Sequence, residues 1–534
     1  MTTKTKILFL IIIIAAILRV IGIAWGLPSK DYYFSYNSDE VNYIRGLSQM
    51  DPARFDFNPH YFNWGSWHYY ELGAAIGLAS FLNIVELNKD KNFYYSHPWV
   101  MAKIYLIGRL LSVLFALATV ILVYLIGKKI YGVREGLLAA LFMAINPAHI
   151  VHSHYLKADT SVTFWLTVLL LTAIYLLETG KLRWYILGGV FSAIAVGSQL
   201  NGIWFIHTIF FAHLLHKYRV SGRLNSFQNV FISKNLLIGY LSVLVVYLII
   251  NPSLYLSTAE FITGIRNVIF RQGGGIDTVG RVNLVINTVR AFGISLTPFF
   301  IVLGLSAVIY GVLSRSKTNL LLLIWLAPYL PFIIGWRALN TRHQMLIFPG
   351  VFVLSSGFIF FLYAKIRKKI LRIILTGGVV LFCLYAAFYS YIYDKGLSGK
   401  TVQAEASEWL VLNVVPKSRI GILNNPEVRH YPTIIHQDYY YKENARYVIV
   451  NLNSSIDNLR AEQPEYLIFN RKVVFAGKQD SYSRSLINYI ENNYKLIKSI
   501  ERRRFFLFFN FEPVFSTPDW EMPFPAIYIL KKTM

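Results

Sequence analysis

Long apolar runs alternate with short polar connections from the start of the chain to about residue 393. Many of these runs have 18 or more residues, which is enough for a helix to cross a hydrocarbon core about 30 Å thick. The pattern predicts about eleven membrane-spanning helices, at residues 6–27, 102–127, 136–150, 159–178, 184–198, 202–216, 234–251, 289–313, 319–336, 343–364 and 370–392. An additional apolar segment at 71–86 is short, and we expect it to be juxtamembrane or re-entrant.

The remaining residues, 394–534, have a different pattern, with mixed charges and short apolar runs. Strands are predicted at 419–423, 447–451, 465–470 and 526–532, and helices at 401–415, 454–463 and 481–494. This mixture is typical of a small α/β domain. The sequence therefore predicts two domains: a polytopic all-α membrane domain at 1–393, with a long first external loop at 28–101, and a soluble extracytoplasmic α/β domain at 394–534.

Composition and charge position support this division. Of the 534 residues, 55% are hydrophobic and only 15% are charged, which favours a membrane protein. The net charge of +24 does not require a nucleic-acid partner, because much of it lies in short loops between apolar runs. The positive-inside rule makes these loops cytoplasmic, so we expect an uncleaved N-terminal anchor, a cytoplasmic N-terminus and an external C-terminal domain in the plasma membrane.

Three of the predicted external connections then carry acidic, basic or imidazole side chains that could take part in catalysis or binding. Asp39 and Glu40 begin the first loop, which also contains His60; the connection at 146–165 contains Lys157 and Asp159; and the start of the tenth span carries Arg342 and His343. Carboxylates at a membrane boundary usually line a cavity or pathway. The pattern indicates a site with a carboxylate base and cations for an anionic group, although polar side chains on solvated loops would give the same pattern.

A metal site is a second interpretation of the connection at 146–165. His152, His154 and Asp159 have suitable ligand chemistry. Their spacing is not that of a tight ligand set, and hydrogen bonding at a helix start would also account for Asp159. The sequence requires no cofactor, and a divalent metal remains open.

Several of these segments together resemble one family. They are the external "DE", "HYFNW" (60–64), "RLLSVLFALATVILVYLIGKKIYG" (109–132), "NPAHIVHSHYLKADT" (146–160) and "TRHQMLIFP" (341–349). The order of these segments, and their predicted position on one side of the membrane, resemble the GT-C superfamily of polytopic glycosyltransferases over about residues 1–365. The closer similarity is to the branch containing dolichyl-phosphate-mannose protein mannosyltransferases and the bacterial aminoarabinose transferases of lipid A.

The resemblance implies inverting transfer of a monosaccharide from a polyprenyl-phosphate-linked donor to a protein, glycolipid or polysaccharide acceptor, among membrane lipids. It assigns the general base to Asp39, with Glu40 as its partner or substitute, and a second acid to Asp159. Two positions depart from the family pattern: His343 stands where a tyrosine is frequent, and "GSQLNG" (197–202) stands where a lysine is frequent.

The chemistry also suggests which cations would bind the donor phosphate. A guanidinium can grip phosphate with two hydrogen bonds, which makes Arg342 the first choice. Lys157, His343 and His60 are second choices.

Two other functions fit a polytopic chain. A lipid or sugar transporter or flippase would usually show internal repeats and charges at mid-membrane depth. No obvious repeat is present, and the ionisable residues lie near the ends of the predicted spans, which favours an enzyme. An oligosaccharide or polymer ligase on the same fold is the other alternative.

Overall fold

The computed structural model describes residues 2–30, 32–62, 64–221, 233–272, 301–329, 341–427, 430–470, 481–502, 505–506, 509–510 and 522–533. These fall into two compact units. The helical unit contains Met1–Val20, Asp39–Glu86 and Leu106–Tyr391, and the sheet unit contains Ile21–Ser38, Leu87–Tyr105 and Ile392–Met534. The sheet unit thus combines the C-terminal segment with two parts of the predicted first loop and with the adjoining ends of the predicted spans 6–27 and 102–127.

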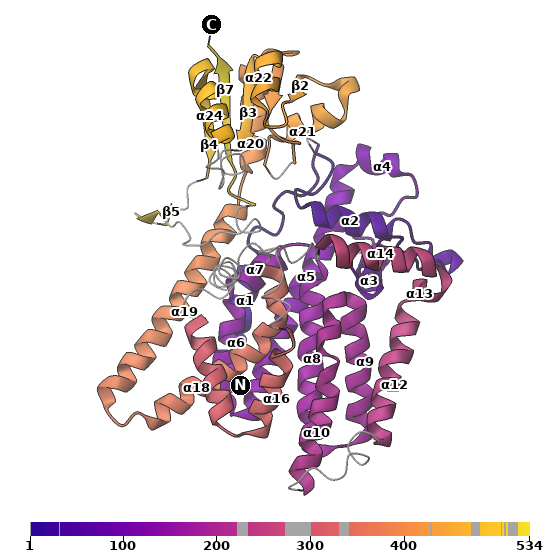
Figure 1. Ribbon diagram of the computed structural model, residues 1–534, viewed down its shortest axis with the longest axis vertical. Helices are drawn as coiled ribbons and strands as arrows, with labels where there is room; N and C mark the ends of the chain where they lie inside the picture. The colour runs from indigo at the N-terminus through magenta and orange to yellow at the C-terminus, as the bar shows by residue number, and fades with distance from the viewer. Residues whose placement is uncertain are drawn as a thin grey trace. The chain divides into compact units, whose positions relative to one another are not determined.

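The helical unit is a bundle of apolar helices (Figure 1). Among the described residues, it contains α1 (Thr3–Val20), α5 (Pro98–Ile130), α6 (Val133–Ala144), α7 (Pro147–Ser153), α8 (Ala158–Thr179), α9 (Leu182–Ser198), η2 (Leu200–Phe205), α10 (His207–Ser221), α12 (Lys234–Ile250), α16 (Lys317–Leu326), η3 (Thr341–Ile347), α18 (Phe348–Lys365) and α19 (Lys369–Leu397). Helix α9 packs against both α8 and α12, and α10 packs against α8 and α16.

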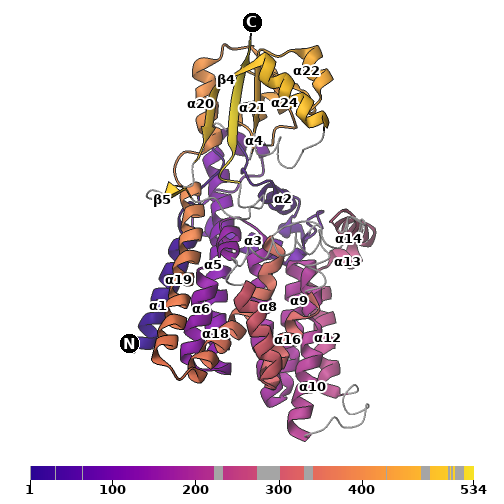
Figure 2. The same cartoon turned by 60° about the vertical axis from the view of Figure 1, so that its left-hand side comes forward.

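Short helices gather at one end of this bundle, as both views show (Figures 1 and 2). They are α2 (Ser38–Leu47), η1 (Pro52–Arg54), α3 (Ser66–Phe81), α13 (Ser253–Leu256) and α14 (Thr258–Gln272). The apolar segment predicted at 71–86 is therefore helical over most of its length, as part of α3.

Among the described residues, four stretches are long and apolar enough to cross a membrane: Pro98–Ile130, Ala158–Thr179, Arg342–Lys365 and Lys369–Asn413. A fifth is formed if α6 and α7, bent by 57° at their junction, count as one span. Shorter apolar helices occupy Leu182–Ser198, Lys234–Ile250, Ile301–Leu313 and Lys317–Leu326. The predicted spans at 289–313 and 319–336 lie partly outside the described residues, so the count of about eleven stays a prediction.

The break between α6 and α7 is held by a buried arginine from α1. Arg19 is fully buried, and its guanidinium donates to the carbonyl oxygens of Ala144 at 2.8 Å and Met143 at 3.2 Å. It also donates to His149 Nδ1 at 2.8 Å. The last carbonyls of a helix lack partners within the helix, and in an apolar bundle they must be satisfied by other protein groups. Arg19 therefore makes the bend possible.

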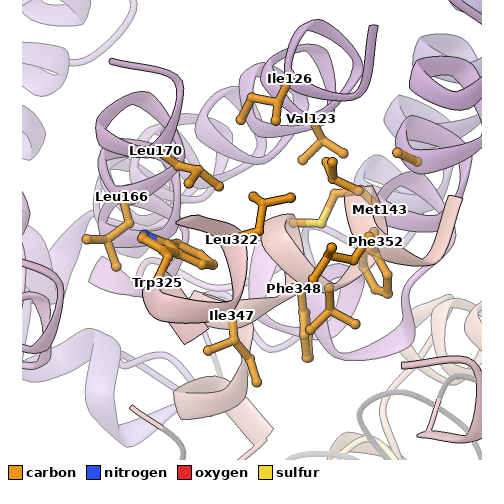
Figure 3. Packing of buried hydrophobic residues seen from close by; sticks show 14 of the residues in the cluster. Val123, Ile126, Met143, Leu166, Leu170, Leu322, Trp325, Ile347, Phe348 and Phe352 are labelled. Atoms are coloured by element: carbon orange, nitrogen blue, oxygen red, sulfur yellow. The ribbon is translucent and has the colours of Figure 1, made fainter. Parts of the chain in front are cut away.

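The core of the helical unit is continuous across its helices (Figure 3). Leu166 and Leu170 of α8 face Leu322 and Trp325 of α16, and Phe348 begins the adjoining part of α18. Between α9 and α12 the contact is backbone to backbone, because a Cβ on Gly189 would lie 2.3 Å from the carbonyl oxygen of Gly239. Small residues permit this close approach of apolar helices.

The sheet unit has a five-stranded sheet of order β2-β1-β3-β7-β4. Its strands are β1 (Arg419–Ile422), β2 (Val448–Asn451), β3 (Tyr466–Asn470), β4 (Tyr494–Glu501) and β7 (Ala526–Lys532), with a separate pair, β5 (Phe505–Phe506) and β6 (Phe509–Asn510). The helical elements are α4 (Lys91–Ser96), α20 (Val402–Asn413), α21 (Thr433–Tyr440), η4 (Lys442–Asn444), α22 (Ile456–Glu462) and α24 (Ser481–Asn493). The strands and helices predicted for this region are confirmed, while α4, α21, η4, β4, β5 and β6 were not predicted.

Both faces of this sheet are covered. Ile468 of β3 belongs to one core cluster with residues of α20 and α21, whereas its neighbours Leu467 and Phe469 belong to another with residues of α22 and α24. A strand buried on both faces has a continuous apolar sequence. This explains why "YLIF" lacks the alternation of a half-exposed strand.

Candidate active site

Three side chains from distant parts of the helical unit meet at the start of α2. Lys157 Nζ lies 3.1 Å from Asp39 Oδ2, and Arg342 Nη1 lies 2.8 Å from the same oxygen. The lysine side chain is 3% exposed and the arginine 17%, whereas the aspartate is 30% exposed. The carboxylate is therefore the member of this trio that solvent reaches most easily.

The two cations control the charge of Asp39. Burial alone would raise the pKa of this carboxyl, but the charges and hydrogen bonds of Lys157 and Arg342 outweigh it and hold the pKa well below its usual range. Asp39 is consequently ionised at neutral pH. It also lies in the first turn of α2, where a negative charge interacts favourably with the helix dipole.

Side chains of α2 contact three successive residues, 156–158, where α8 begins. Glu40 Oε1 accepts the backbone N–H of Leu156 at 2.7 Å, and the hydroxyl oxygen of Tyr43 accepts that of Ala158 at 3.0 Å. Between them, Lys157 makes its ion pair with Asp39. The spacing of Asp39, Glu40 and Tyr43 on one helix thus fixes the position of Lys157 relative to the carboxylate.

Glu40 is itself anchored by Arg109 of α5. The guanidinium donates Nε to Glu40 Oε1 at 2.9 Å and Nη2 to Oε2 at 2.8 Å, and both side chains are fully buried. The carboxylate of Glu40 is thereby engaged at both oxygens. Sequence reasoning missed Arg109, although an arginine inside an apolar run is a signal that it has a partner.

Asp159, the other predicted acid, lies in the first turn of α8 and is 3% exposed. It is close enough to Tyr43 for its charge to act on that hydroxyl: burial raises the pKa of Tyr43 well above its usual value, and the charges of Asp159 and Asp39 raise it further. Within the described part of the chain, the carboxylate of Asp159 makes no hydrogen bond or ion pair.

The two departures from the family pattern contact each other. Asn201, in the "GSQLNG" segment, lies with its side-chain nitrogen 3.1 Å from Nδ1 of His343. His343 is 6% exposed and follows Arg342 directly. The two positions thus form one small polar contact beside the cationic part of the site.

His60 is engaged elsewhere. Its Nδ1 lies 2.9 Å from Oε1 of Glu260 in α14, and its ring also contacts the side chain of Asn58. These contacts attach the first loop to α14. Among the described residues, the His60 ring forms its side-chain hydrogen bonds with Glu260 and Asn58.

The predicted metal ligands do not form a cluster. His154 Nδ1 donates to the carbonyl oxygen of Ile150 at 2.8 Å, within the turn that ends α7. His152 is fully buried in the same helix. Over the described ranges, no group of three or more His, Cys, Asp or Glu side chains is arranged to hold a metal ion, so the structure does not assemble His152, His154 and Asp159 into a site.

A buried carboxylate that the sequence did not single out is Glu71 of α3. It accepts hydrogen bonds from both indole groups, Trp67 Nε1 at 2.6 Å and Trp165 Nε1 at 2.7 Å, and from the hydroxyl of Ser161 at 2.6 Å. Nδ1 of His68 lies 3.1 Å from Glu71 Oε2. Because its oxygens are satisfied, Glu71 serves to attach α3 to α8. The position of Glu71 next to an apolar segment was the signal in the sequence that this carboxylate has partners.

One family model matches part of the chain. Residues 98–250 match the family model described as dolichyl-phosphate-mannose-protein mannosyltransferase; this range contains Lys157 and Asp159. A comparison with curated protein sequences gives no match.

Solved structures extend the likeness over most of the chain. An oligosaccharyltransferase from Archaeoglobus fulgidus, crystallised with a tethered acceptor peptide containing the NVT sequon, has 12% identity and a TM-score of 0.50, covering 92% of this chain and 72% of that one. ArnT from Cupriavidus metallidurans in the apo state has 12% identity and a TM-score of 0.49, covering 99% and 98%. The predicted resemblance to mannosyltransferases of the GT-C type is therefore confirmed, in sequence over residues 98–250 and in fold over most of the chain.

Proposed function

We propose that this protein is a membrane glycosyltransferase that moves a monosaccharide from a polyprenyl-phosphate-linked donor to an acceptor hydroxyl. The observation that carries the proposal is the trio of Asp39, Lys157 and Arg342, which combines an accessible carboxylate with two shielded cations. The match of residues 98–250 to a family named for a dolichyl-phosphate sugar supports the donor class. The reaction takes place at the outer face of the plasma membrane, as the positions of the basic loops predict.

Asp39 is the general base of this reaction. A carboxylate within hydrogen-bond reach of the acceptor takes its proton as the glycosidic bond forms. The acceptor oxygen bonds to the anomeric carbon, the bond from that carbon to the phosphate oxygen breaks, and polyprenyl phosphate leaves with the bonding electrons. A single displacement of this kind inverts the anomeric configuration.

Lys157 and Arg342 bind the donor phosphate. Negative charge develops on the leaving phosphate, and cations held in a shielded site stabilise it. Arg342 supplies a planar guanidinium that suits two phosphate oxygens. His343 follows Arg342 directly and would extend the anion site, whereas His60 is occupied by Glu260.

Asp159 has a role with the sugar hydroxyls of one of the substrates. Its carboxylate is buried yet makes no hydrogen bond or ion pair within the described ranges, so a hydroxyl donor there gains a charged acceptor. Glu40 keeps the site in shape through Arg109 and Leu156.

The substitution Asp39→Asn tests the base. We expect transfer to fall by at least about a hundredfold, because general base catalysis of this kind contributes on the order of 10²–10⁴. The measurement is release of polyprenyl phosphate from a labelled polyprenyl-phosphate sugar by the purified, reconstituted protein. The control is Asp51→Asn, the same charge change at a half-exposed acid of the first loop, which should keep wild-type turnover.

Normal turnover by Asp39→Asn would remove Asp39 from the mechanism. If the wild-type protein leaves the monosaccharide donor intact but moves it across the bilayer, the chain is a flippase or transporter. If it accepts only a lipid-linked oligosaccharide or polymer, it is a ligase on the same fold.

A further inference from the structure

Two cations of the candidate site share a single carboxylate oxygen. Lys157 Nζ and Arg342 Nη1 both point to Asp39 Oδ2, at 3.1 Å and 2.8 Å. Because the lysine side chain is 3% exposed and the arginine 17%, each needs a nearby anion to offset the loss of hydration. In the protein without substrate, Asp39 supplies an anion to both cations.

Taken alone, the trio of Asp39, Lys157 and Arg342 has more positive than negative charge. Two positive side chains face one carboxylate, so the trio carries a net charge of +1 (two minus one). Among the described residues, the groups close to this trio include Tyr43 from α2 itself and a second carboxylate, Asp159 from α8. A phosphate group that approaches the cations would be attracted by them and repelled by Asp39 at the same position.

We propose that Asp39 occupies the donor phosphate's place in the resting protein, and that phosphate binding displaces it from Lys157 and Arg342, which frees it to act as the base. This inference rests on the proposed function, because it assigns the same three side chains. It adds that the carboxylate and the lipid phosphate compete, so the donor must be bound before the acceptor can be deprotonated.

The electrostatics of the site explain why the donor should bind before the acceptor is deprotonated. While both cations contact Asp39, its pKa lies well below the usual range, and such a carboxylate is a weak proton acceptor. Once phosphate neutralises Lys157 and Arg342, the carboxyl loses its stabilising partners and its pKa rises. The base therefore becomes competent only when the leaving group is in place.

Binding of undecaprenyl phosphate to the purified full-length protein in lipid nanodiscs tests the competition. We expect Asp39→Asn to bind this lipid about tenfold more tightly than the wild type, since the competing charge is removed. Asp39→Ala, which also lacks the charge, should show the same gain. Asp51→Asn, which removes a charge from the first loop without touching the cations, should bind as the wild type does. A thermal unfolding scan verifies that each variant is folded.

The outcomes separate this inference from the proposed function. If the wild type binds undecaprenyl phosphate and Asp39→Asn binds it equally well or more weakly, the competition is refuted while the donor site stands. If neither binds, and Arg342→Met changes nothing, the lipid-phosphate site itself is refuted. A gain in both Asp39 variants that is lost when Arg342→Met is added supports the competition.

Discussion

The two adjacent acids of α2 differ most clearly in what surrounds them. Asp39 is partly exposed between two cations, whereas Glu40 is fully buried against Arg109. Breaking a buried ion pair by removing one partner leaves an uncompensated charge inside the protein. The two residues should therefore respond differently to the same chemical change.

The substitution Glu40→Gln should destabilise the fold by about 3–5 kcal/mol, because it leaves Arg109 buried without its counter-ion. Asp39→Asn should cost less, since its carboxylate is 30% exposed. Thermal unfolding of the two variants in the same detergent measures the difference. Equal melting temperatures would contradict the structural role of Glu40.

Sequence reasoning proposed Asp39, Lys157 and Arg342 as site residues because their three connections share a membrane face, and the structure brings these side chains together. It could not separate Asp39 from Glu40 by spacing, because adjacent residues share the same loop. The distinction depends on Arg109, which comes from a helix 69 residues away along the chain. Only the packing of α5 against α2 shows which acid is engaged.

At the scale of elements, the contact between α9 and α12 depends on the absence of a side chain. A Cβ at position 189 would lie 2.3 Å from Gly239 O and 2.7 Å from Ser242 Cβ. Backbone atoms cannot move aside as the end of a side chain can. The helices would have to separate to accommodate even a methyl group.

The substitution Gly189→Ala should therefore destabilise the protein by about 1–3 kcal/mol, the usual cost of overpacking a dense core. Gly378→Ala on α19 is the matched control, because a Cβ there meets nothing within 4 Å. That variant should be unchanged or slightly more stable, since alanine favours a helix over glycine by up to about 1 kcal/mol. The melting temperatures of the two variants, measured under identical conditions, test this difference. A similar loss of stability in both would contradict the close packing at Gly189.

Elements were predicted well where the pattern was local. The pattern and length of apolar runs predicted the strands β1, β2, β3 and β7 and the positions of α5, α8, α9 and α12. The bend between α6 and α7 was not predicted, although Asn146 and Pro147 mark a helix start at the junction. Arg19, which satisfies the carbonyls at the bend, lies in a different helix.

At the scale of the whole molecule, acid should weaken the fold through a half-buried histidine, His436. Burial lowers the pKa of His436 from 6.5 to about 4, so the folded protein keeps this ring neutral where the unfolded chain would protonate it. With a lowered folded-state pKa, the stability contribution is present above about pH 6.5 and is lost as the pH falls toward 4.

We expect the melting temperature of the sheet unit within the full-length protein to fall between pH 6.5 and pH 4. The variant His436→Gln cannot titrate and should show a smaller fall over this range. An identical pH profile in both proteins would show that other groups control the acid response. Circular dichroism of the sheet signal follows the transition.

The carboxylate of Glu71 offers a way to observe the attachment of α3 to α8 directly. Because two indole N–H groups donate to it, the ring protons of Trp67 and Trp165 should resonate downfield of other tryptophans in ¹⁵N-tryptophan-labelled protein. Any event that pulls the first loop from the bundle would move both signals together. The protein thus carries a built-in spectroscopic probe within α3 and α8, on tryptophans outside the Asp39 trio, for following substrate binding without an added label.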